Sequence, residues 1–497
     1  MAGCACKIFE GDRILKKMVT VKNKLRNKWN LIPVTAKATV AYSFCGILQK
    51  CFGFIILPLF TRLLTPEQFG QRTLYFSWKN IMVIFITLNL QQGSFATAMM
   101  KYEDRRDEYI SSIEGICIFL FVFFLGIYLA FENIWNEIIG LPTFINIVMF
   151  IEILTSTAIQ FWSGKKRFEY KYKSVVLVTI INCFFSALIA YILVLIFEEK
   201  GYAQIIGSAL LNIIIGGYIF IYNIFKCKKV FSKEMWKFAL GFNIPLVVYF
   251  LSQFIFNHSD KIMIGRYCGA DKAGIYGLAN SIGMLMTFAI NVINNTYVPW
   301  FYDKLKNNKQ EENKPVSNMI ALLLAMLLLI IIWFSPEIIY ILGGKAYEEA
   351  KWIVPPIAVS VLLLFYSQLF INIEFYYEEK KNLVVASIGA GIVNIILNAL
   401  FIPRLGYIVA GYTTMFSYLI FVISNYFSMK KVVKRRNVKE NCYEYKVLIY
   451  IIIVFIILVF LGELLYRYLM IRIMVIAMIL SIFIYALRRC ISKYIRT

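Results

Sequence analysis

Stretches of about 20 apolar residues recur along almost the whole chain, and they constrain the fold more than any other feature. A helix rises about 1.5 Å per residue, so each stretch is long enough to cross the ~30 Å hydrocarbon layer of a bilayer. We count about fourteen spans: 38–60, 74–95, 110–131, 144–163, 174–197, 204–225, 236–257, 275–301, 316–334, 352–373, 383–402, 407–428, 447–466 and 469–487. With 60% hydrophobic and 16% charged residues, the 497-residue chain has too little charge to cover a soluble globule. The sequence therefore predicts an all-α integral membrane protein.

The distribution of basic residues tests this count, because the loss of one span would exchange the sides of every later loop. With the N-terminus in the cytoplasm, the cytoplasmic segments hold 39 of the 52 Lys and Arg residues and the opposite loops hold 11. We therefore predict a multi-pass protein of a bacterial cytoplasmic membrane with both termini in the cytoplasm. The net charge of +23 follows from this topology and from attraction to anionic lipids, and it requires no nucleic-acid partner.

The N-terminal segment 1–37 has no apolar run followed by a small-residue cleavage site, so we do not interpret it as a secretory signal peptide. Its apolar residues recur at helical spacing, and its basic residues lie largely elsewhere. This pattern favours a basic helix on the cytoplasmic membrane surface, with a disordered basic tail as the alternative. The cysteines show no metal-ligand spacing beyond Cys4 and Cys6, and the chain has one histidine, so we expect neither a metal centre nor a cofactor.

An internal repeat appears when the chain is compared with itself at an offset of 204 residues. Four positions match without a gap: Arg62, Glu67, Gly70 and Leu74 fall on Arg266, Asp271, Gly274 and Leu278. Six spans separate the two copies, and an even number gives both halves the same orientation in the membrane. We therefore predict two six-helix lobes around a central cavity and a C-terminal helix pair without a counterpart. The predicted units are a basic segment 1–37, a first lobe 38–230, a second lobe 231–437, and the helix pair with its basic tail 438–497.

Three sequence motifs resemble those of one transporter family. The segment Thr61-Arg-Leu-Leu-Thr-Pro-Glu-Gln-Phe-Gly70 is similar to the turn after the first helix of polysaccharide flippases, the Wzx-type exporters of O-antigen and teichoic acid. Ser259-Asp-Lys-Ile-Met-Ile-Gly265, with Ala273-Gly-Ile-Tyr276 and Ala279-Asn-Ser281, resembles the family's segment between helices seven and eight. Ile402-Pro-Arg-Leu-Gly406, with Gly411 and Thr413, resembles its turn between helices eleven and twelve. The chain has Ala410-Gly411-Tyr412 where the family usually has Gly-Ala-Ala.

The resemblance implies the fold of the multidrug/oligosaccharidyl-lipid/polysaccharide superfamily, in which a cavity between two lobes opens alternately to each side. It implies a transporter rather than an enzyme. The implied cargo is a glycan joined through pyrophosphate to a polyprenyl lipid, which the protein moves from the inner to the outer leaflet. Two extra helices would accommodate the lipid tail. Besides this lipid-linked glycan, the expected partners are anionic lipids and other glycan-assembly membrane proteins.

Lys50 is the first candidate substrate-binding residue. It stands at position 13 of a 23-residue span. It therefore lies about 15 to 18 Å from either end, whereas a lysine stem reaches only about 6 Å. A cation at that depth costs at least ~2.5 kcal/mol unless it meets an anion or water. Cargo pyrophosphate is such an anion; the alternative is a structural pair with a carboxylate, for which Glu152 in the fourth span is the obvious candidate.

Lys79 is the second candidate substrate-binding residue, although it lies near the end of its span and has the alternative of reaching outward to the membrane surface. Glu152 either pairs with a cavity lysine or relays a proton, and the sequence leaves both open. Arg62, Arg266 and Asp260 are candidates for an outer gate.

Each gate candidate has an alternative. The arginines would anchor their turns to lipid headgroups or to the neighbouring acids Glu67 and Asp271. Asp260 would belong to an interfacial hydrogen-bonded cluster with His258 and Lys261 at the outer end of helix seven.

Two other functions fit this sequence less well. A transporter of the same fold for cationic drugs needs carboxylates and aromatic groups at depth, whereas this chain has lysines there. A membrane glycan polymerase or glycosyltransferase needs an acid, base or nucleophile on a sizeable external loop. The largest predicted external loops, 258–274 and 335–351, look too short for that purpose.

Overall fold

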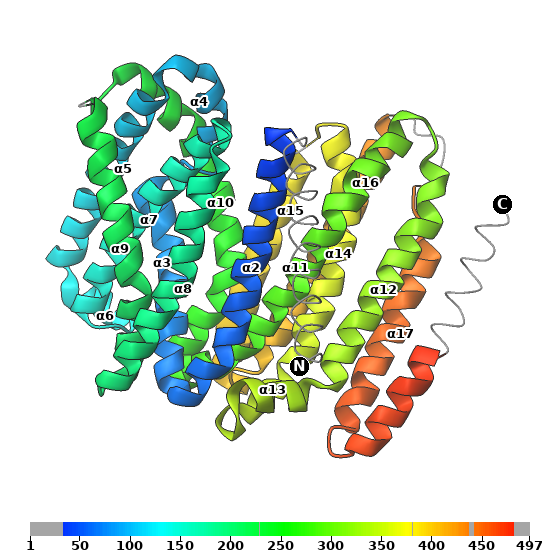
Figure 1. Ribbon diagram of the computed structural model, residues 1–497. Helices are drawn as coiled ribbons and strands as arrows, with labels where there is room; N and C mark the ends of the chain where they lie inside the picture. Colours follow the sequence, from blue (N-terminus) through cyan, green and yellow to red (C-terminus); the bar gives the residue numbers. More distant parts are fainter. Residues whose placement is uncertain (1–32, 228, 380, 437–441, 482–497) are drawn as a thin grey trace, which may run out of the picture.

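The computed structural model describes residues 33–227, 229–379, 381–436 and 442–481, and every regular element in these ranges is helical (Figure 1). The surface helix predicted within 1–37 lies almost wholly outside the described residues, as does the end of the last predicted span. The C-terminal tail also lies outside them.

Thirteen long helices of the described chain correspond to the first thirteen predicted spans. They are α2 (Val34–Leu63), α3 (Pro66–Thr87), α5 (Arg106–Ala130), α7 (Thr143–Phe168), α8 (Tyr172–Ile196), α9 (Lys200–Cys227), α10 (Lys233–Cys268), α11 (Ala270–Lys306), α12 (Asn313–Trp333), α14 (Val354–Tyr376), α15 (Lys381–Leu405), α16 (Val409–Arg435) and α17 (Tyr445–Leu464). A further helix, Leu469–Ser481, covers the described part of the fourteenth span. Between them lie the short helices α4 (Phe95–Lys101), α6 (Glu132–Ile139) and α13 (Ser335–Gly343), and the 3₁₀ helices η1 (Glu103–Arg105), η2 (Gln310–Glu312) and η3 (Lys345–Trp352).

Eleven helices of the described chain are long and apolar enough to cross a membrane, and α3 and α16 are the long helices that fall short of this criterion. Helix α3 carries polar and charged residues along its length, and α16 ends in a basic run. Helix α3 lies at the centre of the bundle, where it contacts α5, α7, α9, α10 and α11. The buried polar groups of α3, Ser77 and Thr87, therefore face other helices instead of lipid.

The predicted bounds of three spans are wrong. Helix α3 begins and ends eight residues before the predicted span 74–95, because the capping signal at Thr65 starts the helix ahead of the apolar run. Helix α10 continues to Cys268 and α11 begins at Ala270, so only Gly269, with a φ of 97°, separates them. The predicted loop 258–274 is therefore almost entirely helical. The polarity of this stretch predicted an exposed loop. In the structure several of its polar side chains, including Asp260 and Lys261, are buried inside the bundle.

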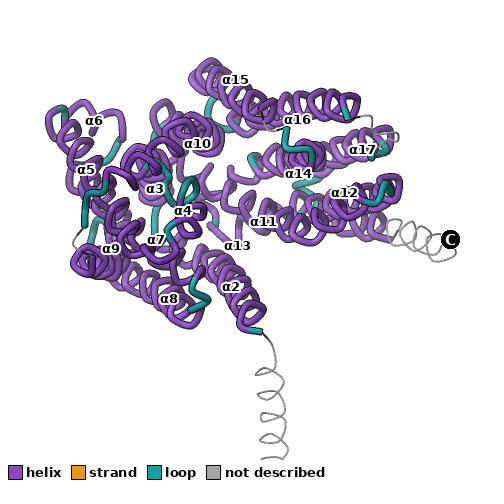
Figure 2. Tube along the Cα trace, turned by 90° about the horizontal axis from the view of Figure 1, so that it is seen from above, coloured by secondary structure: helices purple, strands orange, loops and turns teal. Residues whose placement is uncertain are grey.

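Helices α2–α9, the first half, pack chiefly against one another, as do α10–α16, the second half (Figure 2). The halves meet along α3, which contacts both α10 and α11, while α17 packs against α12 at the edge of the second half. Helix α10 also reaches across, because Trp236 Nε1 donates to the Ser112 carbonyl at 2.9 Å and Asn243 Nδ2 donates to Ser94 Oγ at 2.9 Å. This arrangement agrees with two lobes, and the predicted domain boundaries stay predictions.

The repeat-related turns meet at the end of the bundle marked by α13, opposite the end marked by α4 (Figure 1). A Cβ on Gly70 would lie 1.7 Å from the Ala270 carbonyl oxygen, and a Cβ on Gly274 would lie 2.0 Å from the Pro66 carbonyl oxygen. The contact is reciprocal, so each glycine lets the backbone of the other half approach. The two halves are therefore closed against each other at the α13 end.

The first family-like motif, residues 61–70, builds this contact from local rules. Thr65 caps α3 and forms a capping box with Gln68, and Pro66 occupies the first turn, where its missing N–H costs nothing. Phe69 is buried and packs edge-on against Tyr347 of η3, with ring centroids 6.0 Å apart. The motif thus starts α3 at a fixed residue and brings Gly70 into the reciprocal contact with the second half. We call this contact between Gly70 and Gly274 the seam.

Candidate functional site

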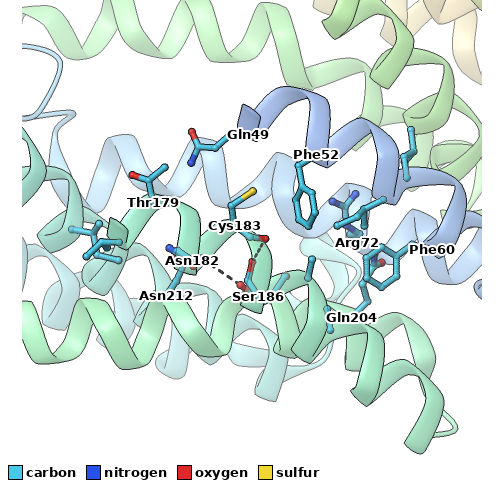
Figure 3. A pocket seen from close by; sticks show the side chains of 18 of the residues that line it. Gln49, Phe52, Phe60, Arg72, Thr179, Asn182, Cys183, Ser186, Gln204 and Asn212 are labelled. Atoms are coloured by element: carbon cyan, nitrogen blue, oxygen red, sulfur yellow. Dashed lines mark hydrogen bonds between the residues drawn. The ribbon is translucent and has the colours of Figure 1, made fainter. Parts of the chain in front are cut away.

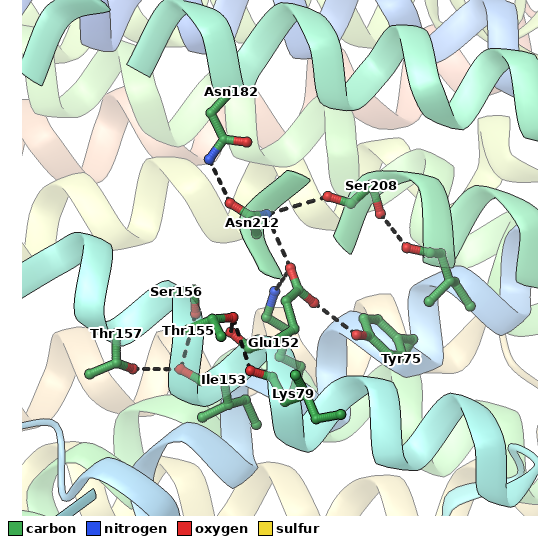
Figure 4. Close-up of polar contacts among 12 residues, drawn as sticks. Tyr75, Lys79, Glu152, Ile153, Thr155, Ser156, Thr157, Asn182, Ser208 and Asn212 are labelled. Atoms are coloured by element: carbon green, nitrogen blue, oxygen red, sulfur yellow. Dashed lines mark hydrogen bonds and ion pairs between the residues drawn. The ribbon is translucent and has the colours of Figure 1, made fainter. Parts of the chain in front are cut away.

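Glu152 is the centre of a buried polar network inside the first half (Figure 4). Lys79 Nζ lies 2.5 Å from Glu152 Oε1, and the side chains are 15% and 3% exposed. Tyr75 donates its hydroxyl to Glu152 Oε2 at 2.8 Å, and Asn212 Nδ2 donates to Oε1 at 3.2 Å. Asn182 Nδ2 donates in turn to Asn212 Oδ1 at 2.5 Å. The network joins α3, α7, α8 and α9, and it satisfies both carboxylate oxygens.

This network settles which lysine pairs with Glu152. The sequence named Glu152 as the structural partner available to Lys50, whereas the carboxylate contacts Lys79. Helix periodicity does not show which way a side chain points toward a neighbouring helix, so the sequence did not distinguish the two lysines.

Lys50 occupies a different environment. It is exposed and lines a cavity of about 350 Å³ whose other walls come from the second half; we call it the Lys50 cavity. The polar lining residues are Lys50, Asn257, His258, Asp260, Asn280, Thr287, Asn291, Ser360 and Thr414. Within the described parts of the chain, no carboxylate lies within ion-pair distance of Lys50. At 1.5 Å per residue, Lys50 stands about 24 Å and about 20 Å from the two ends of α2.

Asp260 lies in the wall of the Lys50 cavity and is 5% exposed. It accepts hydrogen bonds from the Tyr276 hydroxyl at 2.8 Å, from Asn398 Nδ2 at 2.6 Å and from Thr414 Oγ1 at 2.7 Å. These neutral donors come from α11, α15 and α16. The predicted position of Asp260 at the outer end of helix seven is wrong, because α10 continues for eight more residues. Its role in a gate stays a prediction.

Arg62 and Arg266 are both exposed at the α13 end. The Arg62 guanidinium donates to the Ile341 carbonyl of α13 at 3.3 Å. Arg266 borders a hollow that Glu137 also lines. Neither arginine forms an ion pair with any described carboxylate, so the predicted anchoring by Glu67 and Asp271 is not found. Anchoring to headgroups and a gating role stay open.

Arg72 is not among the predicted site residues, because the predicted span 74–95 leaves it in an outer loop. The capping signal at 65–68 would have placed it in the second turn of α3. It lines a cavity of about 390 Å³ enclosed by α2, α3, α7, α8 and α9, which we call the Arg72 pocket (Figure 3). The other polar and aromatic lining residues are Gln49, Phe52, Phe60, Phe69, Thr179, Asn182, Ser186, Gln204, Ser208 and Asn212.

Comparisons of the sequence give a consistent set of relatives. A protein-family model described as "Polysaccharide biosynthesis protein" matches residues 35–305. The "Lsg locus putative protein 1" of Haemophilus influenzae is 23% identical over 414 residues, which cover 80% of this chain and 98% of that protein. An "uncharacterized membrane protein" of the same organism is 22% identical over 364 residues, which cover 71% and 86% of the two chains.

Two solved structures share the fold. The lipid II flippase MurJ in an inward closed conformation has a TM-score of 0.71 at 14% identity and covers 90% of this chain and 99% of its own. An inward-facing multidrug resistance MATE family transporter has a TM-score of 0.58 at 13% identity, with 80% and 99% covered. Identities this low show the fold and leave the cargo open. These neighbours are transporters and not enzymes, and the family model covers more than half of the sequence. The chain therefore belongs to the polysaccharide biosynthesis protein family, with the fold of these multi-pass transporters.

Proposed function

We propose that this protein moves a polyprenyl-pyrophosphate-linked oligosaccharide from the inner to the outer leaflet of a bacterial cytoplasmic membrane by alternating access. The single observation that carries the proposal is Lys50, a deep cation that forms no ion pair with any described carboxylate and lines a polar cavity between the halves. A cation at this depth is costly unless an anion or water compensates it. Cargo pyrophosphate supplies that anion when the carrier is loaded.

The chemistry around Lys50 supports a glycan more than a cationic drug. Asn257, Asn280 and Asn291 line the same cavity and offer amide donors and acceptors for sugar hydroxyls. Asp260 is the carboxylate of this cavity, but three neutral donors already occupy it. The ammonium of Lys50 also repels a cationic ligand. A cation antiporter of the same fold is therefore the weaker candidate.

The conformation fits a carrier that accepts cargo at the α4 end. The halves are closed at the α13 end by the reciprocal glycine contact. The predicted basic, cytoplasmic loops belong to the α4 end, so the cavity would receive cargo from the inner leaflet. Lys79 has a permanent carboxylate partner, and we assign it to holding the first-half helices together instead of to the cargo.

Replacement of Lys50 tests this function. In a strain that depends on this chain for surface glycan, Lys50→Ala should insert at normal levels and abolish export, while Lys50→Arg keeps the charge and should retain part of it. Lys173→Ala removes an exposed lysine at the start of α8 and serves as the matched control, with export unchanged. The measurements are surface glycan by immunoblot and protein amount in purified membranes. Full export by a well-expressed Lys50→Ala protein would show that the cargo does not depend on this cation.

A further inference from the structure

The Arg72 pocket is a second polar cavity, separate from the Lys50 cavity and lined by first-half helices. Helix α2 lies between the two. Gln49, Phe52, Ile56 and Phe60 recur on it at helical spacing and line the pocket, whereas Lys50 lines the other cavity. A pocket of about 390 Å³ falls within the ~300–1,000 Å³ range of small-molecule sites.

Arg72 is the charged group of this pocket. Its guanidinium carbon lies 5.5 Å from the Phe69 ring and 4.8 Å from the Phe76 ring. A guanidinium has five N–H donors and stays charged in proteins. Among the residues that the structure describes, none accepts a hydrogen bond from Arg72 or pairs with it. This cation is held on aromatic faces with its donors unused.

The buried Glu152 network does not supply an anion to Arg72. Both oxygens of Glu152 are taken by Lys79, Tyr75 and Asn212. No described carboxylate therefore pairs with Arg72, and its charge is available to an oxyanion of a ligand or of lipid. An Arg fork matches the two oxygens of a carboxylate or phosphate group, which makes either oxyanion a suitable partner.

The rest of the lining indicates what carries the oxyanion. Figure 3 shows aromatic side chains beside the guanidinium, Phe52 and Phe60, and amides farther along the pocket, Asn182 and Asn212. Gln204 has a buried side-chain oxygen without a hydrogen-bond donor. Such an oxygen accepts a hydrogen bond from a sugar hydroxyl, and an aromatic ring packs on the C–H face of a sugar. An acyl chain has no hydroxyl groups to pair with these amides, so the lining fits a sugar better than a lipid tail.

We propose that the Arg72 pocket binds an acidic sugar, with the guanidinium on its carboxylate and the amides on its hydroxyls. This assignment rests on the proposed function, because the acidic sugar would be a residue of the transported glycan. The cargo would then carry a second negative charge besides its pyrophosphate. The Arg72 pocket would then select among glycans by their acidic sugar, and Lys50 would bind the pyrophosphate that all cargo of this class shares.

Binding to the purified full-length protein in detergent tests the pocket without transport. The probes are glucuronate, glucose and inorganic phosphate, titrated while thermal unfolding is followed. Glucuronate should raise the unfolding temperature and glucose should not. Arg72→Gln should weaken glucuronate binding at least about tenfold, since it removes charge-assisted hydrogen bonds. Arg72→Lys keeps the charge without the fork and should bind with intermediate affinity.

A steric pair of variants covers the case in which Arg72→Gln fails to fold. Gly53 lines the pocket, and a Cβ there would meet no atom within 4 Å, so Gly53→Leu fills space without touching the charge. It should abolish glucuronate binding. Gly46→Leu adds the same side chain two turns earlier on α2, also with no atom within 4 Å of the Cβ and outside the pocket, and it should bind like the parent protein.

Three results would overturn the proposal. They are absence of glucuronate binding, equal binding by the parent and Gly53→Leu proteins, and Arg72-dependent stabilisation by phosphate that glucuronate does not reproduce. Vesicles of phosphatidylglycerol form a further arm, because stabilisation by this lipid alone would assign Arg72 to a headgroup. Lys50→Ala should bind glucuronate normally. Glucuronate binding therefore tests the Arg72 pocket, and surface glycan in the Lys50 variants tests the export function independently.

Discussion

Lys50 and Lys79 lie in neighbouring helices of the first half, both inside predicted spans, and the structure gives them opposite surroundings. Lys79 contacts a buried carboxylate that also accepts from a tyrosine and an asparagine. Lys50 faces a cavity in which no described carboxylate pairs with it. A paired cation holds helices together, because removing either partner leaves an uncompensated charge. An unpaired cation has its charge available for a ligand. The difference therefore separates a lysine held in an ion pair from the lysine that we propose binds the cargo.

The largest expected effect on stability comes from breaking the buried pair. Glu152→Ala leaves Lys79 without its anion, and we expect the protein to lose about 3–5 kcal/mol of stability. Lys79→Ala alone should also destabilise, by leaving the carboxylate unpaired. The double variant should recover much of the loss, since it removes both charges. Thermal unfolding in detergent and the yield of folded protein measure these effects.

A second double-mutant cycle, matched to the first, combines Glu152→Ala with Lys50→Ala in place of Lys79→Ala. Because Glu152 contacts Lys79 and not Lys50, the effects of Lys50→Ala and Glu152→Ala should add within about 0.5 kcal/mol. A large rescue of Glu152→Ala by Lys50→Ala would show that these two groups pair in some state of the protein. The contrast between the two lysines would then be lost.

A smaller effect is expected at the seam that closes the α13 end. Alanine at Gly70 or at Gly274 brings a Cβ within 2.0 Å or less of a carbonyl oxygen of the other half. Overpacking of this kind costs about 1–3 kcal/mol. Because the contact is reciprocal, both variants should lower the unfolding temperature and export to a similar degree. Gly217→Ala, at a position where a Cβ would meet nothing within 4 Å, is the control. A normal unfolding temperature and normal export in both variants would show that the closed seam is dispensable.

The last prediction concerns the side of the membrane from which Lys50 is reached, and its test measures labelling instead of stability. On a background without the ten native cysteines, a membrane-impermeant thiol reagent applied outside should modify Gly140→Cys and spare Asn308→Cys. Both positions are exposed, one at the α13 end and one at the α4 end. The reverse pattern would place the Lys50 cavity toward the other leaflet.

Several features followed from the sequence because they depend on local patterns. Apolar runs placed the helices, and the offset of 204 residues found the glycines that meet at the seam. The cost of a charge at depth singled out Lys50 without any knowledge of its neighbours. The family-like motifs at 61–70 and 259–281 each form a specific structural feature. The first forms a capping box and a close glycine contact, and the second provides the hydrogen bond from Tyr276 to Asp260.

The tertiary structure decided what depends on how each helix is turned toward its neighbours. In the structure Glu152 pairs with Lys79, and Asp260 lies inside the bundle because α10 continues through a polar stretch. Arg72, which the predicted spans leave in a loop, lines a pocket in the structure. Hydropathy measures how apolar a segment is, and periodicity gives the angle between residues on one helix. Neither contains the distance between two helices, so pairs of buried charges and the cavities they face are determined only when the helices pack.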